Sequence, residues 1–240
     1  MQKTPLVAVI GACGGAGASA VAAALAQGLR RSLGRGVLVD LDSGGAGIDV
    51  LLGVEEEPGA RWPELAGARG EVDGRGLLAA LPRWGAVPVL SAARSEPSAP
   101  ADEVVLDVCA ALLGAGEAVV VDLPRPGALT AAARALLADA DRVLLVAPST
   151  FPGAAGAIAA ARALDGVRTG PVGLVVRGAA TGRVDAMELQ ALTGLDVVAQ
   201  VGEDRSMPGA VERGEGPRVG RGTRLGRLGA QLAELVGAGR

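Results

Sequence analysis

Short runs of consecutive apolar residues recur along the chain, separated by longer stretches in which apolar and polar residues are mixed. The runs begin at Leu6, Val37, Val87, Val119, Val143, Val172 and Val197. Polar residues do not alternate with apolar ones inside these runs, which is typical of strands that are covered on both faces. The pattern therefore indicates a parallel sheet enclosed between layers of helices.

The stretches between these runs carry apolar residues at helical spacing. In residues 19–33, Val21, Leu25 and Leu29 are four apart, and residues 101–113 repeat this spacing. Strands that alternate with helices form βαβ units with right-handed crossovers. We expect a three-layer α/β fold, in which a mostly parallel, twisted sheet of about seven strands has helices on both faces. Ligands then bind at the carboxyl ends of the strands.

Two segments interrupt this alternation. Residues 55–74 are rich in turn formers but contain Trp62 and Leu65, so we expect an ordered surface loop there. Residues 93–102 are typical of a plain connection. Neither segment resembles a domain linker, and 240 residues fall within the range of one α/β domain. We expect residues 1–240 to form a single domain.

Composition and charge narrow the function classes. The formal net charge of -3 argues against nucleic acid as a partner. Cys13 and Cys109 form no ligand-spaced cluster, as in proteins of a reducing compartment. No apolar run reaches the ~20 residues of a membrane span, and the N-terminus lacks a signal-peptide layout. We expect a cytoplasmic protein whose membrane contact, where there is any, is peripheral and made through partners.

A glycine-rich loop, "GACGGAGASA" in residues 11–20, follows the first apolar run and precedes a predicted helix. Such a loop can turn its backbone amides inward around a phosphate. Ser19 stands where phosphate loops place a Mg²⁺ ligand, but Ala18 stands where they place a lysine. Lys3, which precedes the first strand, is the only lysine of the chain. The alternative is that small residues here merely let a helix pack close to the sheet.

Acidic residues end two of the predicted strands. Asp40 and Asp42 close the run "VLVDLD", and Asp122 closes "VVVDL". Strand-end carboxylates that face a serine beyond a glycine loop are an oxygen-ligand arrangement suited to Mg²⁺. The alternative is that these residues cap turns or helices.

The order of these segments resembles the MinD/ParA family of deviant-Walker ATPases. "GGAGAS", "VDLDSGGAGIDVLLG" and "VVVDLP" follow one another as that family's loop, Asp-x-Asp segment and strand-end Asp do. "LVVRG" and "VGED", at residues 174–178 and 201–204, match its adenine-side segments. The lysine-free loop, residues 51–74 and residues 202–217 resemble the actinobacterial septum-site-determining branch, which is related to the CpaE/TadZ proteins of Tad pilus loci.

The resemblance implies a nucleotide site. The residues that it assigns to ATP are Gly14, Gly15, Ala16, Gly17, Ala18, Ser19, Arg177 and Glu203. Ser19 and Asp122 would hold Mg²⁺, and in an active enzyme Asp42 would orient the attacking water with support from Asp40. Arg177 takes the place of an adenine-contacting Asn. Cys13 takes the place of the family's second lysine, which reaches across a homodimer.

The departures from the family pattern bear on activity. Losing one charge-assisted phosphate contact costs about 1.5 to 3 kcal/mol, or roughly 10- to 100-fold in affinity. Losing a group that stabilises transition-state charge costs on the order of 100- to 1000-fold in rate. We therefore expect ATP and Mg²⁺ to bind weakly or not at all, and hydrolysis to suffer more than binding.

Three functions follow from the resemblance. The first is a regulatory or positioning protein of septum-site selection or Tad pilus assembly. Such a protein would dock protein partners of that machinery, and a homodimer is also compatible with the resemblance. The second is an active ATPase in which Arg125, close after Asp122, replaces the lysine. The third is a ParA-like DNA-binding protein that uses Arg221, Arg224 and Arg227 of a predicted C-terminal helix. The related branch usually carries an N-terminal receiver-like domain, which we expect to be absent here.

Overall fold

The computed structural model describes residues 4–42, 47–93, 99–178 and 183–238. The strands are β1 (Leu6–Gly11), β2 (Val37–Asp40), β3 (Arg83–Trp84), β4 (Val87–Leu90), β5 (Val119–Leu123), β6 (Arg142–Pro148), β7 (Val172–Arg177) and β8 (Asp196–Val201). The α-helices are α1 (Ala18–Leu33), α2 (Ile48–Leu52), α3 (Gly74–Ala80), α4 (Asp102–Gly114), α5 (Ala131–Asp139), α6 (Phe151–Asp165), α7 (Ala186–Thr193), α8 (Met207–Val211) and α9 (Arg224–Ala238). Two short 3-10 helices are η1 (Pro63–Leu65) and η2 (Pro126–Ala128).

The strands form one sheet in the order β3-β4-β2-β5-β1-β6-β7-β8. All neighbouring pairs are parallel except β3 and β4, which are antiparallel. The predicted mostly parallel α/β sheet is confirmed, with eight strands where about seven were expected. The additional strand, β3, is only two residues long and contains no apolar run, so hydrophobic patterning gave no signal for it.

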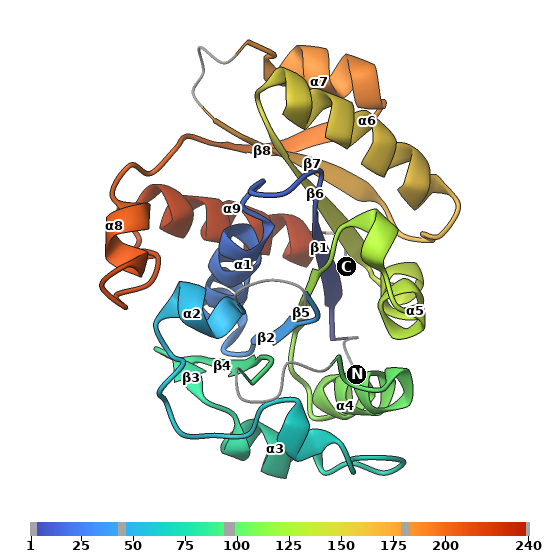
Figure 1. Cartoon of the computed structure of the whole chain (residues 1–240), viewed down its shortest axis with the longest axis vertical. Coiled ribbons are helices and arrows are strands. Elements are labelled where there is room, and N and C mark those ends of the chain that lie inside the picture. The colour runs from blue at the N-terminus through green and yellow to red at the C-terminus, as the bar shows by residue number, and fades with distance from the viewer. Residues whose placement is uncertain (1–3, 43–46, 94–98, 179–182, 239–240) are drawn as a thin grey trace.

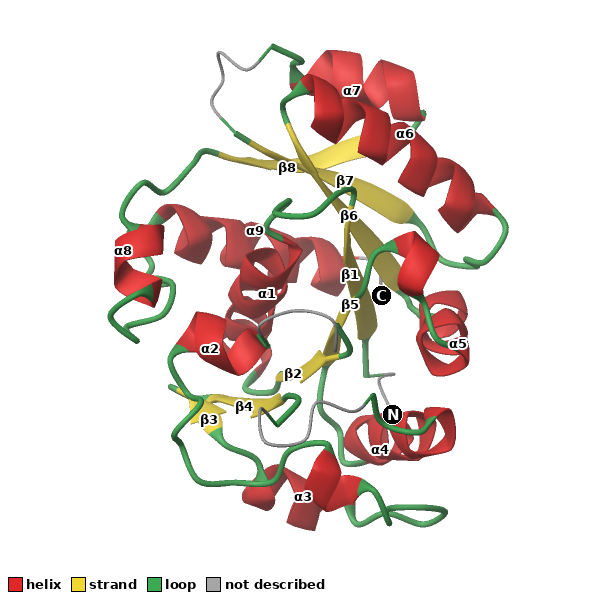
Figure 2. Ribbon diagram, viewed as in Figure 1, coloured by secondary structure: helices red, strands yellow, loops and turns green. Residues whose placement is uncertain are grey.

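Helices cover both faces of the sheet, as Figures 1 and 2 show for α1 and α9 on one side and α4 and α5 on the other. Successive residues of β1 alternate between the two cores: Leu6 and Ala8 belong to one, and Val7 and Val9 to the other. Both cores are apolar, which explains why the strands appear in the sequence as continuous rather than alternating runs.

The C-terminal helix α9 packs directly on α1. Leu225, Leu228 and Leu232 are buried against it, as the leucine spacing predicts. A side chain at Gly229 would clash with the backbone of α1, because its Cβ would overlap the Ala24 carbonyl. The close approach of these two helices fixes α1, and with it the loop that precedes α1.

The turn-rich segment 55–74 is ordered, as predicted, and part of it is buried. Trp62 is 2% exposed, and η1 follows it directly. The Arg61 guanidinium donates hydrogen bonds to the carbonyls of Val54 and Glu55 and lies 3.8 Å from the Asp49 carboxylate. Much of the connection predicted at 93–102 lies outside the described residues. Within the described residues, no helix combines the length and apolar character needed to cross a bilayer.

Candidate nucleotide site

A tight loop joins β1 to α1 at the carboxyl end of the sheet. Gly15 and Gly17 adopt φ angles of 71° and 88°, a left-handed conformation that glycine reaches without steric cost. The Ala16 amide donates to the Cys13 carbonyl at 3.2 Å and closes the turn. No described side chain caps the first turn of α1, so the amides of that turn are available to an anion. The loop has the backbone shape of a phosphate cradle.

Strands β2 and β5 bring two carboxyl groups to the same edge of the sheet. Asp40 lies directly opposite Asp122 in the parallel register. The two residues are 4% and 2% exposed. Ser19, in the first turn of α1, donates a side-chain hydrogen bond to the Asp122 carboxylate. Three of the predicted site residues therefore lie together, on elements far apart in the sequence.

Burial sets the protonation of this cluster. Burial and the neighbouring Asp40 carboxylate raise the pKa of Asp122 to about 8, against the hydrogen bond from Ser19. Burial also raises the pKa of Asp40 to about 6, although the amides of Ile48 and Asp42 each donate to its carboxylate at 2.9 Å. Both shifts favour the neutral form of the two carboxyl groups. A bound cation would supply the opposite charge that the buried pair lacks.

The oxygen atoms of this cluster fit Mg²⁺, which binds carboxylate, hydroxyl, phosphate and water oxygens. Across the described ranges, no three His, Cys, Asp or Glu side chains converge to hold a metal ion. A closed protein cage is therefore not built here. Ser19 and Asp122 suit a Mg²⁺ ion that takes its remaining ligands from phosphate and water.

Asp42 lies just beyond β2 and is half-buried. Its charge contributes to the raised pKa of both Asp40 and Asp122, so its carboxyl lies near theirs. Asp42 thus lies at the same edge of the sheet as Asp40 and Asp122, as the sequence predicted. Residues 43–46, which continue the segment that resembles the family, lie outside the described residues.

A cavity of about 410 Å³ opens beside the start of α1. Ala20, Val21 and Leu225 contribute apolar groups to its wall, and Arg177 and Glu203 contribute charged ones. A planar base fits such a pocket, because its faces are apolar and its edges carry polar atoms. The predicted adenine-side residues Arg177 and Glu203 therefore lie beside the loop.

Arg177 also contacts the loop itself. Its Nη1 donates to the Gly15 carbonyl at 2.9 Å. An ideal Cβ placed on Gly17 would lie 2.6 Å from this Nη1 and 3.0 Å from the Arg177 Cδ. The sequence predicted that Arg177 contacts the base alone. The direction in which its side chain extends from the end of β7 to the loop cannot be predicted from the order of residues.

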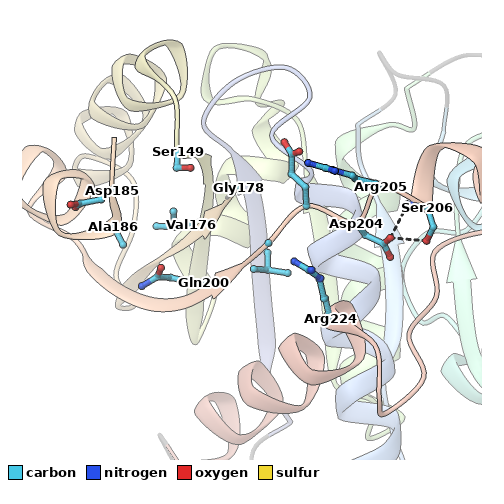
Figure 3. A pocket seen from close by; sticks show the side chains of 13 residues that line it. Ser149, Val176, Gly178, Asp185, Ala186, Gln200, Asp204, Arg205, Ser206 and Arg224 are labelled. Carbon is cyan, nitrogen blue, oxygen red and sulfur yellow. Dashed lines mark hydrogen bonds between the residues drawn. The ribbon is translucent and has the colours of Figure 1, made fainter. Parts of the chain in front are cut away.

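A larger cavity of about 760 Å³ lies on the other side of residues 201–206. Figure 3 shows Ser149, Val176 and Gln200 at one side of this cavity and Asp204 and Arg224 at the other. Its lining contains no residue of the glycine loop. The smaller cavity, which shares Gly17 with the loop, is therefore the better candidate for a nucleotide base.

The other residues singled out by the sequence lie as follows. Arg125, the predicted substitute for the lysine, is exposed at the start of η2, and no contact joins it to the described part of the loop. Cys13 is half-buried, and its Cβ would lie 3.4 Å from a Cβ added to Gly156 of α6. Cys109 is fully buried in α4, and burial raises its pKa to about 12, as suits a core thiol.

Trp62 was predicted only as part of an ordered loop, but it reaches the site. Its indole Nε1 donates to the Asp40 carbonyl at 2.8 Å, and its amide donates to the Ser91 carbonyl at 3.0 Å. The segment 55–74 is thereby attached to the carboxyl end of β2. A tryptophan in a turn-rich segment was the one signal for this contact.

The C-terminal arginines do not form one basic row. Helix α9 begins only at Arg224, so Arg218 and Arg221 precede it. Arg218 lies 3.7 Å from the Glu215 carboxylate, and Arg227 donates to the Gly222 carbonyl at 2.7 Å. Arg224 lines the larger cavity near Asp204. These arginines therefore point to different surroundings, because glycines interrupt the segment before the helix starts.

Comparison with known proteins gives relatives at the level of sequence and of fold. No protein-family model matches the chain. An uncharacterized protein of Mycobacterium tuberculosis, found in two strains, is 41% identical over 208 residues, which are 87% of this chain and 56% of that protein. The chain thus spans little more than half the length of the curated relatives that it matches.

Solved structures with a similar fold include a ParA family ATPase and MinD proteins. A ParA family ATPase from Chlorobium tepidum has a TM-score of 0.79 at 16% identity, over 96% of this chain and 99% of its own. MinD in the MinC:MinD cell division complex of Aquifex aeolicus gives 0.77 at 15%, over 98% and 96%. MinD of Pyrococcus horikoshii, determined with Mg-ADP, gives 0.74 at 20%, over 99% of both chains. The chain has the MinD/ParA P-loop fold.

Proposed function

We propose that this chain is a regulatory or positioning protein of septum-site selection or Tad pilus assembly. In this proposal it acts by docking protein partners, binds ATP and Mg²⁺ weakly or not at all, and does not turn ATP over at a useful rate. The observation that carries the proposal is the uneven state of the site: the loop shape and the Ser19–Asp122 contact are present, whereas Cys13 and Ala18 stand where the resembled family has lysines.

In this proposal the loop backbone and the acidic side chains have different roles in nucleotide binding. Backbone amides of residues 14–19 would bind phosphate oxygens, and the side chains of Ser19 and Asp122 would hold Mg²⁺. Mg²⁺, when bound, would neutralise charge on the phosphates. Asp42, supported by Asp40, would hold a water in an active enzyme. With neither lysine, nothing on the loop's own side chains stabilises the charge that develops during phosphoryl transfer.

Protein partners are supported by the fold. Among the neighbours in structure, MinD is found in a complex with MinC. Phe151, at the start of α6, is 64% exposed, and it lines a cavity that also includes Gly15 of the loop. A large exposed apolar side chain beside the site suits contact with a protein, either a partner or a second copy. We place this activity in the cytoplasm.

Steady-state ATP turnover tests the proposal. The purified chain with Mg²⁺ and ATP should release no phosphate above a buffer blank. Turnover that disappears in Asp42→Ala would refute it, because that residue would then be working as the water-orienting group. Arg162→Ala, an exposed change on α6, serves as the control for contaminating activity, since contamination is indifferent to both substitutions.

One observation supports the active-ATPase alternative with a different arginine from the one that the sequence suggested. The arginine that contacts the loop is Arg177 rather than Arg125. If turnover is found, Arg177→Ala should abolish it and Arg125→Ala should not.

The DNA-binding alternative is weakened by the divergent surroundings of the C-terminal arginines. It requires a salt-sensitive gel shift that is lost on replacing Arg221, Arg224 and Arg227.

A further inference from the structure

Arg177 is held in place by the sheet. It is the last residue of β7 and lies opposite Pro148 of β6 in the parallel register. Its carbonyl accepts a hydrogen bond from the Ser149 amide at 2.8 Å. The backbone at this position is therefore fixed, and its side chain leaves the carboxyl end of the sheet toward the loop between β1 and α1.

The guanidinium group approaches the loop backbone at two positions, Gly15 and Gly17. Nη1 donates to the Gly15 carbonyl at 2.9 Å. The same atom and the Cδ lie 2.6 and 3.0 Å from the point that a Cβ of Gly17 would occupy. Glycine at position 17 thus serves two purposes, since it permits the left-handed φ and leaves room for the arginine.

Among the residues that the structure describes, Arg177 forms no ion pair, although Glu203 lines the same cavity. Within the described residues its one hydrogen-bond partner is the Gly15 carbonyl, which is uncharged. A guanidinium has five N–H donors in a rigid fork, so most of them are available. The group also lies beside the start of α1, a 16-residue helix whose first amides carry partial positive charge. Two positive groups placed side by side are stabilised by an anion between them.

We propose that Arg177 supplies the cation of the phosphate site, in place of the lysine that is absent at Ala18. Its guanidinium binds the phosphate oxygens of a nucleoside diphosphate or triphosphate whose phosphates rest on residues 14–19. This inference rests on the proposed nucleotide site and sharpens it, because it favours weak binding over none. Arg177 lines the 410 Å³ cavity as well as contacting Gly15, so it lies between the base pocket and the loop.

This position has a consequence for selectivity. A lysine at position 18 would enter from the helix, whereas Arg177 enters from β7 and from the base side. Its charge therefore acts on the phosphates nearest the nucleoside, which ADP and ATP share. We expect the two nucleotides to bind with affinities within about threefold of each other, since a charge on shared groups does not discriminate between them.

Titration calorimetry of the full chain tests the role of Arg177. The probes are Mg-ADP, Mg-ATP, pyrophosphate and adenosine, and the variants are Arg177→Ala, Arg177→Lys and Arg162→Ala. Arg162 is the matched control, because it is an exposed arginine of α6 that lines neither of the two cavities described above. Arg177→Ala should weaken Mg-ADP and pyrophosphate by roughly 10- to 100-fold and leave adenosine within about threefold. Arg162→Ala should change the binding of all the probes by less than about threefold.

Two further variants keep the test decisive. Arg177→Lys should recover part of the lost affinity, because it keeps the charge and loses the fork. Adding Ala18→Lys to Arg177→Ala should restore Mg-ADP binding, since it returns a cation to the same phosphates from the other side. Thermal melts of each variant show whether it is folded, and the lysine variants report on charge even where the alanine variant is unstable.

The outcomes separate this inference from the proposed function. Equal or tighter Mg-ADP binding by folded Arg177→Ala would overturn the inference, because the arginine would then be covering the site. No binding by the unaltered chain at millimolar Mg-ADP would also overturn it, while the docking protein without nucleotide would stand. ATP turnover that survives Arg177→Ala and disappears in Asp42→Ala would refute both. Loss of adenosine affinity alone would assign Arg177 to the base.

Discussion

The two halves of the candidate site treat charge in opposite ways. The carboxylate half is formed by Ser19, Asp40 and Asp122, and its two acidic side chains are almost completely buried, which raises the pKa of both. In the loop half, residues 14–18 present backbone amides, and no residue of the loop itself brings a cation. The positive charge beside the loop is that of Arg177, the last residue of β7, which contacts the Gly15 carbonyl.

The difference shows what each half needs in order to keep its shape. The glycine loop is shaped by backbone dihedral angles and by the packing of α1. The turn therefore keeps its shape with Ala18 at the position where phosphate loops place a lysine. The carboxylate half is shaped by the side chains themselves, because Asp40 accepts two backbone amides and Asp122 accepts the Ser19 hydroxyl. The loop can therefore lose a charged side chain at little structural cost, whereas replacing Asp40 or Asp122 removes hydrogen bonds that hold the carboxylate half together.

The largest effect is expected from the pH dependence of the carboxylate half. The pKa of Asp122 is raised to about 8 in the native state, from an ordinary value of 3.8. The stability that the neutral carboxyl contributes is full below about pH 4 and is lost as pH rises through about 8, because the unfolded chain releases the proton first. In the presence of a chelator, the free energy of unfolding should fall by up to about 4 kcal/mol between pH 5 and pH 9.

Asp122→Asn isolates this contribution. The amide resembles the protonated carboxyl in shape and cannot ionise, so the fall in stability toward pH 9 should become much smaller. Urea unfolding at pH 5, 7 and 9 measures it, and Asp139→Asn, a change at an exposed carboxyl on α5, controls for the loss of one charge. An unaltered pH dependence in Asp122→Asn would show that the carboxylate half is better solvated than its burial implies.

The sequence predicted the two halves to different depths. Continuous apolar runs fixed the parallel sheet, because residues of each strand alternate between two apolar cores, and parallel strands bring Asp40 and Asp122 to one edge. Motif order placed the loop before α1. The contacts made by Arg177 and Trp62 could not be predicted, because they depend on how far a side chain reaches between elements that are distant in the sequence.

An intermediate effect is expected in the loop half from Gly17→Ala. A left-handed φ costs a residue with a Cβ roughly 1 to 2 kcal/mol, and the added Cβ would also collide with the Arg177 guanidinium. We expect a loss of about 2 to 3 kcal/mol in unfolding free energy, together with loss of Mg-ADP binding.

Gly14→Ala is the matched control for Gly17→Ala. A Cβ at Gly14 meets no atom within 4 Å, and its φ is not positive. It should cost less than about 0.5 kcal/mol. Removing the guanidinium with Arg177→Ala in the Gly17→Ala background should recover the collision part of the loss and leave the dihedral part. Equal costs for Gly14→Ala and Gly17→Ala would mean that the loop is looser than the left-handed turn indicates.

The smallest effect is expected where the carboxylate half meets segment 55–74. Trp62→Phe keeps an aromatic ring but removes the Nε1 donor from the buried Asp40 carbonyl. An unsatisfied buried acceptor costs about 1 to 2 kcal/mol, so urea unfolding should show a loss of that size. Trp84→Phe, at the other tryptophan, alters a half-buried residue of the edge strand β3 and should cost less.

Hydrogen exchange shows whether Trp62 also positions the carboxylate. Because the Asp40 carboxylate accepts hydrogen bonds from the amides of Ile48 and Asp42, a loosened Asp40 backbone in Trp62→Phe should speed exchange at those two amides. Exchange that stays unchanged at both amides would mean that Trp62 stabilises the core without positioning the carboxylate, and the two halves would then be held by their own elements alone.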